Sequence, residues 1–104
     1  MTSRFWLLGA QGSLEAVGER LTRALAVELH RHESGYRGGD YLRGDGPTVQ
    51  EVIVQTNFED EEGYLAESEF PESSVLIYLT QAIDAPPLES LESEGLRVLR
   101  FEEL

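Results

Sequence analysis

The chain has 104 residues, of which 40% are hydrophobic, and this size predicts one compact domain over residues 1–104. The absence of cysteine excludes disulfides and thiolate metal sites. No apolar run has the length of a signal segment or a membrane span, so we expect a soluble, cytoplasmic protein that does not bind membranes.

The formal net charge of −12 is unevenly distributed along the chain. Residues 1–44 hold six Arg and five acidic residues, a net charge of +1. Residues 45–104 hold two Arg and fifteen acidic residues, a net charge of −13. An anionic half of this strength repels nucleic acids and speeds the encounter with a cationic protein surface. The alternative is that the acidity only aids solubility.

The first part of the chain predicts a strand followed by a long helix. Residues 4–9 (RFWLLG) have the short, apolar pattern of a buried strand. Ser13 is a suitable N-cap, and apolar residues then recur at every third or fourth position. These apolar residues are Leu14, Val17, Leu21, Leu25 and Leu29. The pattern predicts an amphipathic helix over residues 13–31.

A Gly-rich segment, residues 32–47, follows this helix and predicts mainly loop. A short strand near residues 40–43 is expected to pair with residues 49–57 through a turn at residues 45–47. Within residues 49–57, Val52 and Val54 lie on one face and Ile53 lies on the other with polar Glu51 and Gln55, which indicates a strand covered largely on one side.

The last part of the chain predicts two strands and a short helix. Residues 74–81 (SVLIYLTQ) are apolar on both faces and indicate a central strand. A short helix is expected from Leu88 to Gly95, followed by a strand over residues 96–101. The predicted fold class is α+β, close to α/β. It has a mixed sheet of four or five strands, one long helix packed on the sheet, and one or two short helices, in the order β-α-β-β-(α)-β-α-β.

The densest acidic stretch, Phe58–Glu72, lies between the two apolar strands and contains seven carboxylates and no basic residue. Within it, Tyr64, Leu65 and Phe70 could pin a short helix to the core. Interfaces between proteins combine aromatic anchors with a polar rim, and charge steers the encounter. The candidate partner-binding residues are therefore Glu59, Asp60, Glu61, Glu62, Tyr64, Glu67 and Glu69. A solvated loop with its aromatics in the core is the alternative.

The turn Gly9–Ser13 connects the first strand to the helix, a position where backbone N–H groups can hold an anion. Gln11 stands where a dinucleotide-binding motif has its second glycine, and a Walker motif needs a Lys that the chain lacks. We expect a simple connection there, with an anion or small-molecule site as the alternative.

No metal site, cofactor or catalytic residue is expected. His30 and His32 would point about 200° apart on the predicted helix, and they could share an ion only if the helix ended before His30. The run Glu59–Glu62 lacks the alternating ligands and the glycine of an EF-hand loop. No serine-hydrolase or zinc-peptidase motif is present.

In size, charge and element order the chain resembles the bacterial immunity proteins that neutralise toxins, with no sequence motif behind the resemblance. It implies a non-catalytic, stoichiometric inhibitor whose acidic surface covers the basic site of a toxin or nuclease, with Tyr64 as an apolar anchor. A phosphate mimic that blocks a DNA-binding protein is a close variant. The alternatives are a small-molecule or anion-binding enzyme centred on Gly9–Ser13 and a homo-oligomeric structural protein.

Overall fold

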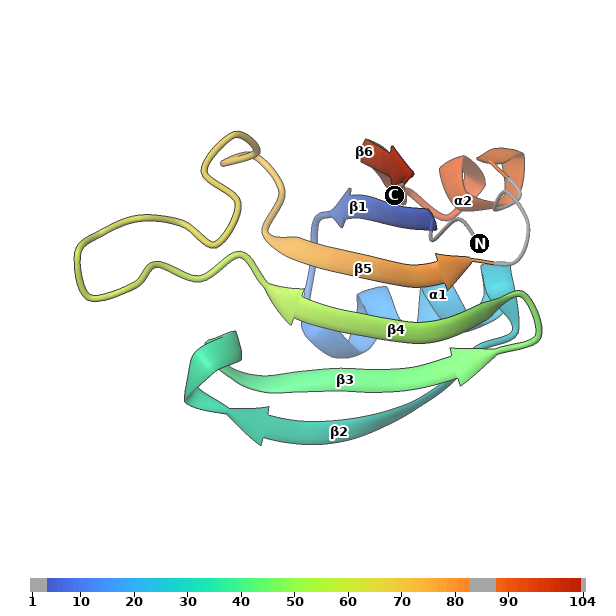
Figure 1. The fold of residues 1–104 in the computed structure, drawn as a ribbon, viewed down its shortest axis with the longest axis horizontal. Coiled ribbons are helices and arrows are strands. Elements are labelled where there is room, and N and C mark those ends of the chain that lie inside the picture. The colour runs from blue at the N-terminus through green and yellow to red at the C-terminus, as the bar shows by residue number, and fades with distance from the viewer. Residues whose placement is uncertain (1–3, 83–87, 104) are drawn as a thin grey trace.

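The computed structural model describes residues 4–82 and 88–103, which form a six-stranded sheet with helices against one face (Figure 1). The order across the sheet is β2-β3-β4-β5-β1-β6, and every neighbouring pair is antiparallel. The strands are β1 (Arg4–Ala10), β2 (Glu28–Ser34), β3 (Gly39–Gly46), β4 (Val49–Thr56), β5 (Val75–Ala82) and β6 (Arg97–Glu103). The helical elements are α1 (Leu14–Leu25), the 3-10 turn η1 (Gly35–Arg37) and α2 (Leu88–Ser93).

The predicted fold class is wrong in the type of sheet and in the length of the helix. The sheet has six antiparallel strands, whereas a mixed sheet of four or five strands was expected. The long helix predicted over residues 13–31 is absent, because α1 has 12 residues and residues 28–34 form the edge strand β2. The helix considered within the acidic stretch is also absent, and turns and one isolated bridge take its place.

The start of α1 was predicted, and its end was not. Ser13 caps the helix, and its Oγ accepts a hydrogen bond from the backbone N–H of Ala16 at 3.1 Å. At the other end Ala26 adopts the left-handed conformation with a φ of 55°, and its N–H donates to the carbonyl oxygen of Thr22 at 2.9 Å. This left-handed cap stops the helix and turns the chain toward the sheet.

The apolar spacing that suggested a longer helix has a second interpretation. Leu25, Val27 and Leu29 are all apolar, and this alternation by two is the pattern of a strand. Leu25 and Val27 are buried, and Leu29 is half-buried. The spacing from Leu25 to Leu29 fits a helix equally well, so the local pattern alone could not place the boundary.

The core lies between the sheet and the two helices. In Figure 1, α1 runs behind β4 and β5. Leu14, Val17, Leu21 and Leu25 on α1 pack in one cluster with apolar side chains of the central strands, and Leu91 of α2 belongs to the same cluster. From the strands, the fully buried members of the cluster are Leu8, Val49, Val52, Val54, Val75, Ile77 and Leu79. No helix in the described ranges has the length and hydropathy to cross a membrane.

Candidate functional site

The acidic stretch forms a projecting arm. The chain leaves the end of β4, extends beyond the sheet and returns to β5 (Figure 1). Residues 58–66, which we call the acidic arm, run out and back as two antiparallel segments. The N–H of Ala66 donates to the carbonyl oxygen of Phe58 at 2.9 Å, and Glu59 and Leu65 form a bridge.

The tip of the acidic arm is ordered by its own hydrogen bonds. Oδ1 of Asp60 accepts from the backbone N–H groups of Glu62 at 2.9 Å and Tyr64 at 3.0 Å. The N–H of Asp60 donates to the carbonyl oxygen of Tyr64 at 2.8 Å. Gly63 has a φ of 87°, a conformation that favours glycine. The Asp60 carboxylate therefore shapes the turn, and the tip has a defined conformation before any partner binds.

The arm presents carboxylates and one aromatic ring to solvent. Glu59, Glu61 and Glu62 are exposed, and in the described residues none of them lies in an ion pair. Tyr64 is 64% exposed. The expectation that aromatics of this stretch pin a helix to the core is therefore wrong for Tyr64, whose exposure favours the alternative of a binding surface.

The base of the arm is held against the sheet by one side chain. Nδ2 of Asn57 donates to the carbonyl oxygens of Glu67 at 3.3 Å and Phe70 at 3.0 Å. Oδ1 of Asn57 accepts from the N–H of Glu67 at 2.9 Å. Asn57 directly follows β4, so these three bonds tie residues 67–70 to the end of the strand and leave the arm to project.

Glu67 differs from the other predicted site residues because its side chain points inward and is only 16% exposed. Its Oε1 accepts a hydrogen bond from the Tyr78 hydroxyl at 2.9 Å and lies 3.3 Å from Nη2 of Arg100. Burial, and then the hydrogen bond to Glu67, raise the pKa of Tyr78 above its ordinary value. Glu67 thus belongs to the packing of the sheet face, whereas Glu69 is exposed beside the arm.

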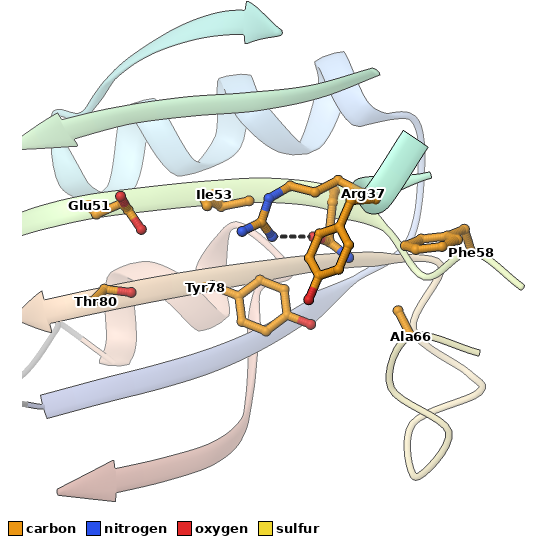
Figure 2. Close-up of a pocket in the computed structure, with 9 residues that line it drawn as sticks. Arg37, Glu51, Ile53, Phe58, Ala66, Tyr78 and Thr80 are labelled. Atoms are coloured by element: carbon orange, nitrogen blue, oxygen red, sulfur yellow. Dashed lines mark hydrogen bonds between the residues drawn. The ribbon is translucent and has the colours of Figure 1, made fainter. Parts of the chain in front are cut away.

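A hollow lies next to the base of the arm on the helix-free face of the sheet, the face that bears Ile53, Gln55 and Tyr78 (Figure 2). Its volume is about 470 Å³. Strands β4 and β5 form its floor, η1 forms one wall, and the arm forms the other. The lining residues are Tyr36, Arg37, Glu51, Ile53, Gln55, Phe58, Ala66, Tyr78 and Thr80.

Arg37 is the cation of this hollow. Its Nη1 donates to Oε1 of Gln55 at 2.8 Å, and Gln55 is only 3% exposed. Its guanidinium carbon lies 5.6 Å from the centroid of the Tyr41 ring, within cation–π range. Figure 2 shows the Arg37 side chain lying over β4 near Ile53, with both helices on the far side of the sheet.

Sequence reasoning missed this hollow. The alternation along β4 indicates that Glu51, Ile53 and Gln55 share one face, and register places Ile53 opposite Tyr78 on β5. Arg37, however, lies in the Gly-rich segment predicted as loop, and nothing in the local pattern shows that it reaches over β4. The expectation that β4 is covered largely on one side is wrong, because Ile53 and Gln55 are also buried.

The secondary structure around the two histidines differs from the prediction. Because α1 ends at Leu25, His30 and His32 lie on β2, where positions i and i+2 share a face. Nε2 of His30 is 3.4 Å from a carboxylate oxygen of Glu28, and the His32 ring stacks on Tyr41 with centroids 5.5 Å apart. Among the described residues no group of three or more ligands has metal-binding geometry.

The turn Gly9–Ser13 is a compact strand-to-helix connection. Ser13 caps α1, and Nη1 of Arg20 donates to the carbonyl oxygen of Gln11 at 3.0 Å. The Arg20 side chain therefore reaches back from α1 and covers this connection. An anion site at this turn stays an untested alternative.

The chain was also compared with known proteins. No protein-family model, no curated protein and no solved structure matches it.

Proposed function

We propose that this protein is a non-catalytic inhibitor that binds a basic protein partner stoichiometrically through the acidic arm. The observation that carries the proposal is the arm itself, which combines exposed carboxylates and an exposed Tyr64 on a turn ordered by internal hydrogen bonds.

The conformation of the arm favours binding. A disordered acidic loop would lose conformational entropy on association, whereas a turn that is already ordered keeps more of its interaction energy as affinity. The exposed carboxylates of Glu59, Glu61 and Glu62 supply long-range attraction to Lys and Arg on a partner. Tyr64 supplies the type of side chain that dominates binding energy when it enters a partner pocket.

The geometry refines the roles of the predicted residues. Glu59, Glu61, Glu62 and Tyr64 contact the partner in this proposal, and Asp60 shapes the turn. Glu69 contributes to the same negative field from the base. Glu67 instead supports the arm from the sheet, through its contacts with Tyr78 and Arg100.

The partner class follows from size and charge. A chain of net charge −12 that resembles immunity proteins in these two properties is suited to cover the basic site of a toxin or nuclease in the cytoplasm. The element order, which contributed to the resemblance, differs from the prediction, so the proposal rests on the charge and on the arm.

The test is affinity capture from the native host, followed by titration of the captured protein. The arm variant carries Glu59→Gln, Glu61→Gln and Glu62→Gln. A matched control changes the same number of exposed carboxylates elsewhere, at Glu33, Glu89 and Glu92. We expect the wild type and the control to retain one basic protein at low salt, to release it at high salt, and to inhibit it at a one-to-one ratio.

The arm variant should lose most of this retention, because it lacks the three carboxylate charges on the arm. The control has the same net charge as the arm variant, so the comparison isolates the position of the charges. An acidic partner, retention that ignores salt, or equal retention by the two variants would contradict the proposal.

A further inference from the structure

We propose that the hollow beside the acidic arm binds a small organic carboxylate with a flat apolar body, and that Arg37 is the residue that holds the carboxylate. This proposal does not depend on the partner proposed for the arm. It rests on the lack of an acidic partner for Arg37 among the described residues, on the geometry around its guanidinium, and on the shape and lining of the hollow (Figure 2).

Arg37 has no acidic partner among the described residues, although the chain has 20 acidic side chains. Most other arginines are neutralised by a carboxylate within 4.0 Å. These are Arg4, Arg23, Arg31, Arg43 and Arg100. Arg37 is also half-buried inside a hollow, where a charge without a counterion is costly. A bound anion would supply the missing counterion.

The guanidinium is held in place and keeps free donors. Gln55, which is almost fully buried, accepts one of its N–H groups at 2.8 Å, and the ring of Tyr41 lies within cation–π range. A guanidinium has five N–H donors, and a carboxylate is the planar group that accepts two of them in parallel. The contact with Gln55 therefore orients Arg37 for a ligand without consuming its binding capacity.

The rest of the hollow suits the body of such a ligand. Ile53 and Phe58 offer apolar surface, and the Tyr36 ring, which is 87% exposed, stands at the rim. Thr80 and Tyr78 add hydroxyl groups to the lining. A volume of about 470 Å³ falls in the range of sites for small molecules.

The ligand should be a monoanion. Glu51, the acid of the hollow, is paired with Arg43 at 2.8 Å, so Arg37 meets little local competition. The whole chain, however, carries a net charge of −12 and repels multiply charged anions more strongly than singly charged ones. Because the hollow offers the single cation Arg37 within a negatively charged protein, we expect it to bind a carboxylate more tightly than a phosphate.

The test is a titration followed by the NMR signals of the Gln55 side-chain amide and the Arg37 Nε–H group. The probes are 3-phenylpropionate, indole-3-acetate and 4-hydroxybenzoate, the primary amide of each acid, and inorganic phosphate. We expect saturable shifts with at least one carboxylate and binding of its amide that is weaker by about ten-fold or more, because the amide lacks the charge-assisted contact.

Three variants locate the effect. Arg37→Gln should weaken carboxylate binding by about ten-fold or more, while Arg20→Gln, on the helix-covered side of the sheet, should leave it unchanged. Gln55→Glu keeps Arg37 but places a carboxylate next to its guanidinium. Because this carboxylate would form an ion pair with Arg37 in place of the ligand, the variant should also lose carboxylate binding. Backbone NMR spectra of all three variants show directly whether the sheet remains folded.

The proposal fails if no carboxylate shifts these signals saturably, or if an amide binds as well as its acid. Equal binding by wild type and Arg37→Gln would also overturn it, as would phosphate that binds more tightly than every carboxylate.

Discussion

The two faces of the sheet differ in what covers them and in the chemistry they hold. On the helix-covered face, α1 and α2 close over a cluster of apolar side chains. On the helix-free face, η1 and the base of the arm cover one end, and polar groups such as Gln55 and Glu67 are enclosed with their partners. One face therefore holds the main apolar core, and the other holds the polar groups that surround the hollow.

The difference is visible within a single strand. Val52 and Val54 of β4 are fully buried on the helix-covered face. The alternate residues, Ile53 and Gln55, face the hollow. Because successive side chains of a strand point to opposite faces, four consecutive residues serve two separate environments. Substitutions on the two faces should therefore have separable effects on stability and on binding.

The largest expected effect is on the helix-covered face. Leu21→Ala removes a fully buried side chain between α1 and the sheet and should lower the free energy of unfolding by about 3 kcal/mol. Urea unfolding followed by circular dichroism measures the loss. Tyr36→Ala, at an exposed ring, is the control and should change stability by less than about 0.5 kcal/mol. Similar losses in both variants would remove the distinction between the faces.

A smaller effect is expected where the arm joins the sheet. Asn57→Ala removes three hydrogen bonds to the backbone at residues 67–70, and it should cost about 1–2 kcal/mol. Hydrogen exchange should accelerate first at the N–H of Glu67, which loses its acceptor, while amides of α1 change little. Asn57→Asp keeps that acceptor and should protect the Glu67 N–H better than Asn57→Ala does. Unchanged exchange at Glu67 in both variants would show that another contact holds the base.

The enclosed Tyr78 gives the helix-free face a pH dependence. Its pKa is higher in the folded protein than in the unfolded chain, so the unfolded chain loses the proton first as the pH rises. The stability contributed by the protonated hydroxyl is complete below the unfolded pKa of about 10 and is lost progressively above it. Tyr78→Phe should flatten this alkaline slope of the free energy of unfolding. An identical slope in wild type and variant would contradict the assignment.

The smallest effect on stability is expected at the tip of the arm. Glu61→Gln together with Glu62→Gln changes two exposed side chains that lie in no ion pair among the described residues. The free energy of unfolding should change by less than about 0.5 kcal/mol and tend to rise, because repulsion between carboxylates falls. Thermal unfolding measures this directly. A clear loss of stability would mean that these carboxylates have structural partners and are less available for binding.

Local patterns in the sequence determined several features of this protein. The aromatic and aliphatic run of β1, the Ser13 cap of α1, the apolar run of β5 and the position of the acidic stretch were all recognisable. Each depends on neighbouring residues, because strand alternation, helix capping and local charge are properties of a few consecutive side chains.

Only the tertiary structure decided the remaining features. Whether Leu29 continues a helix or begins the edge strand depends on pairing between β2 and β3, and strand direction depends on how the whole chain crosses the sheet. In the same way, Glu67 turns inward because its carboxylate binds Tyr78 and Arg100 on the helix-free face. Arg37 binds Gln55, which lies 18 positions further along the sequence. Such contacts join residues far apart in the chain, so they cannot be predicted from the composition or spacing within one segment.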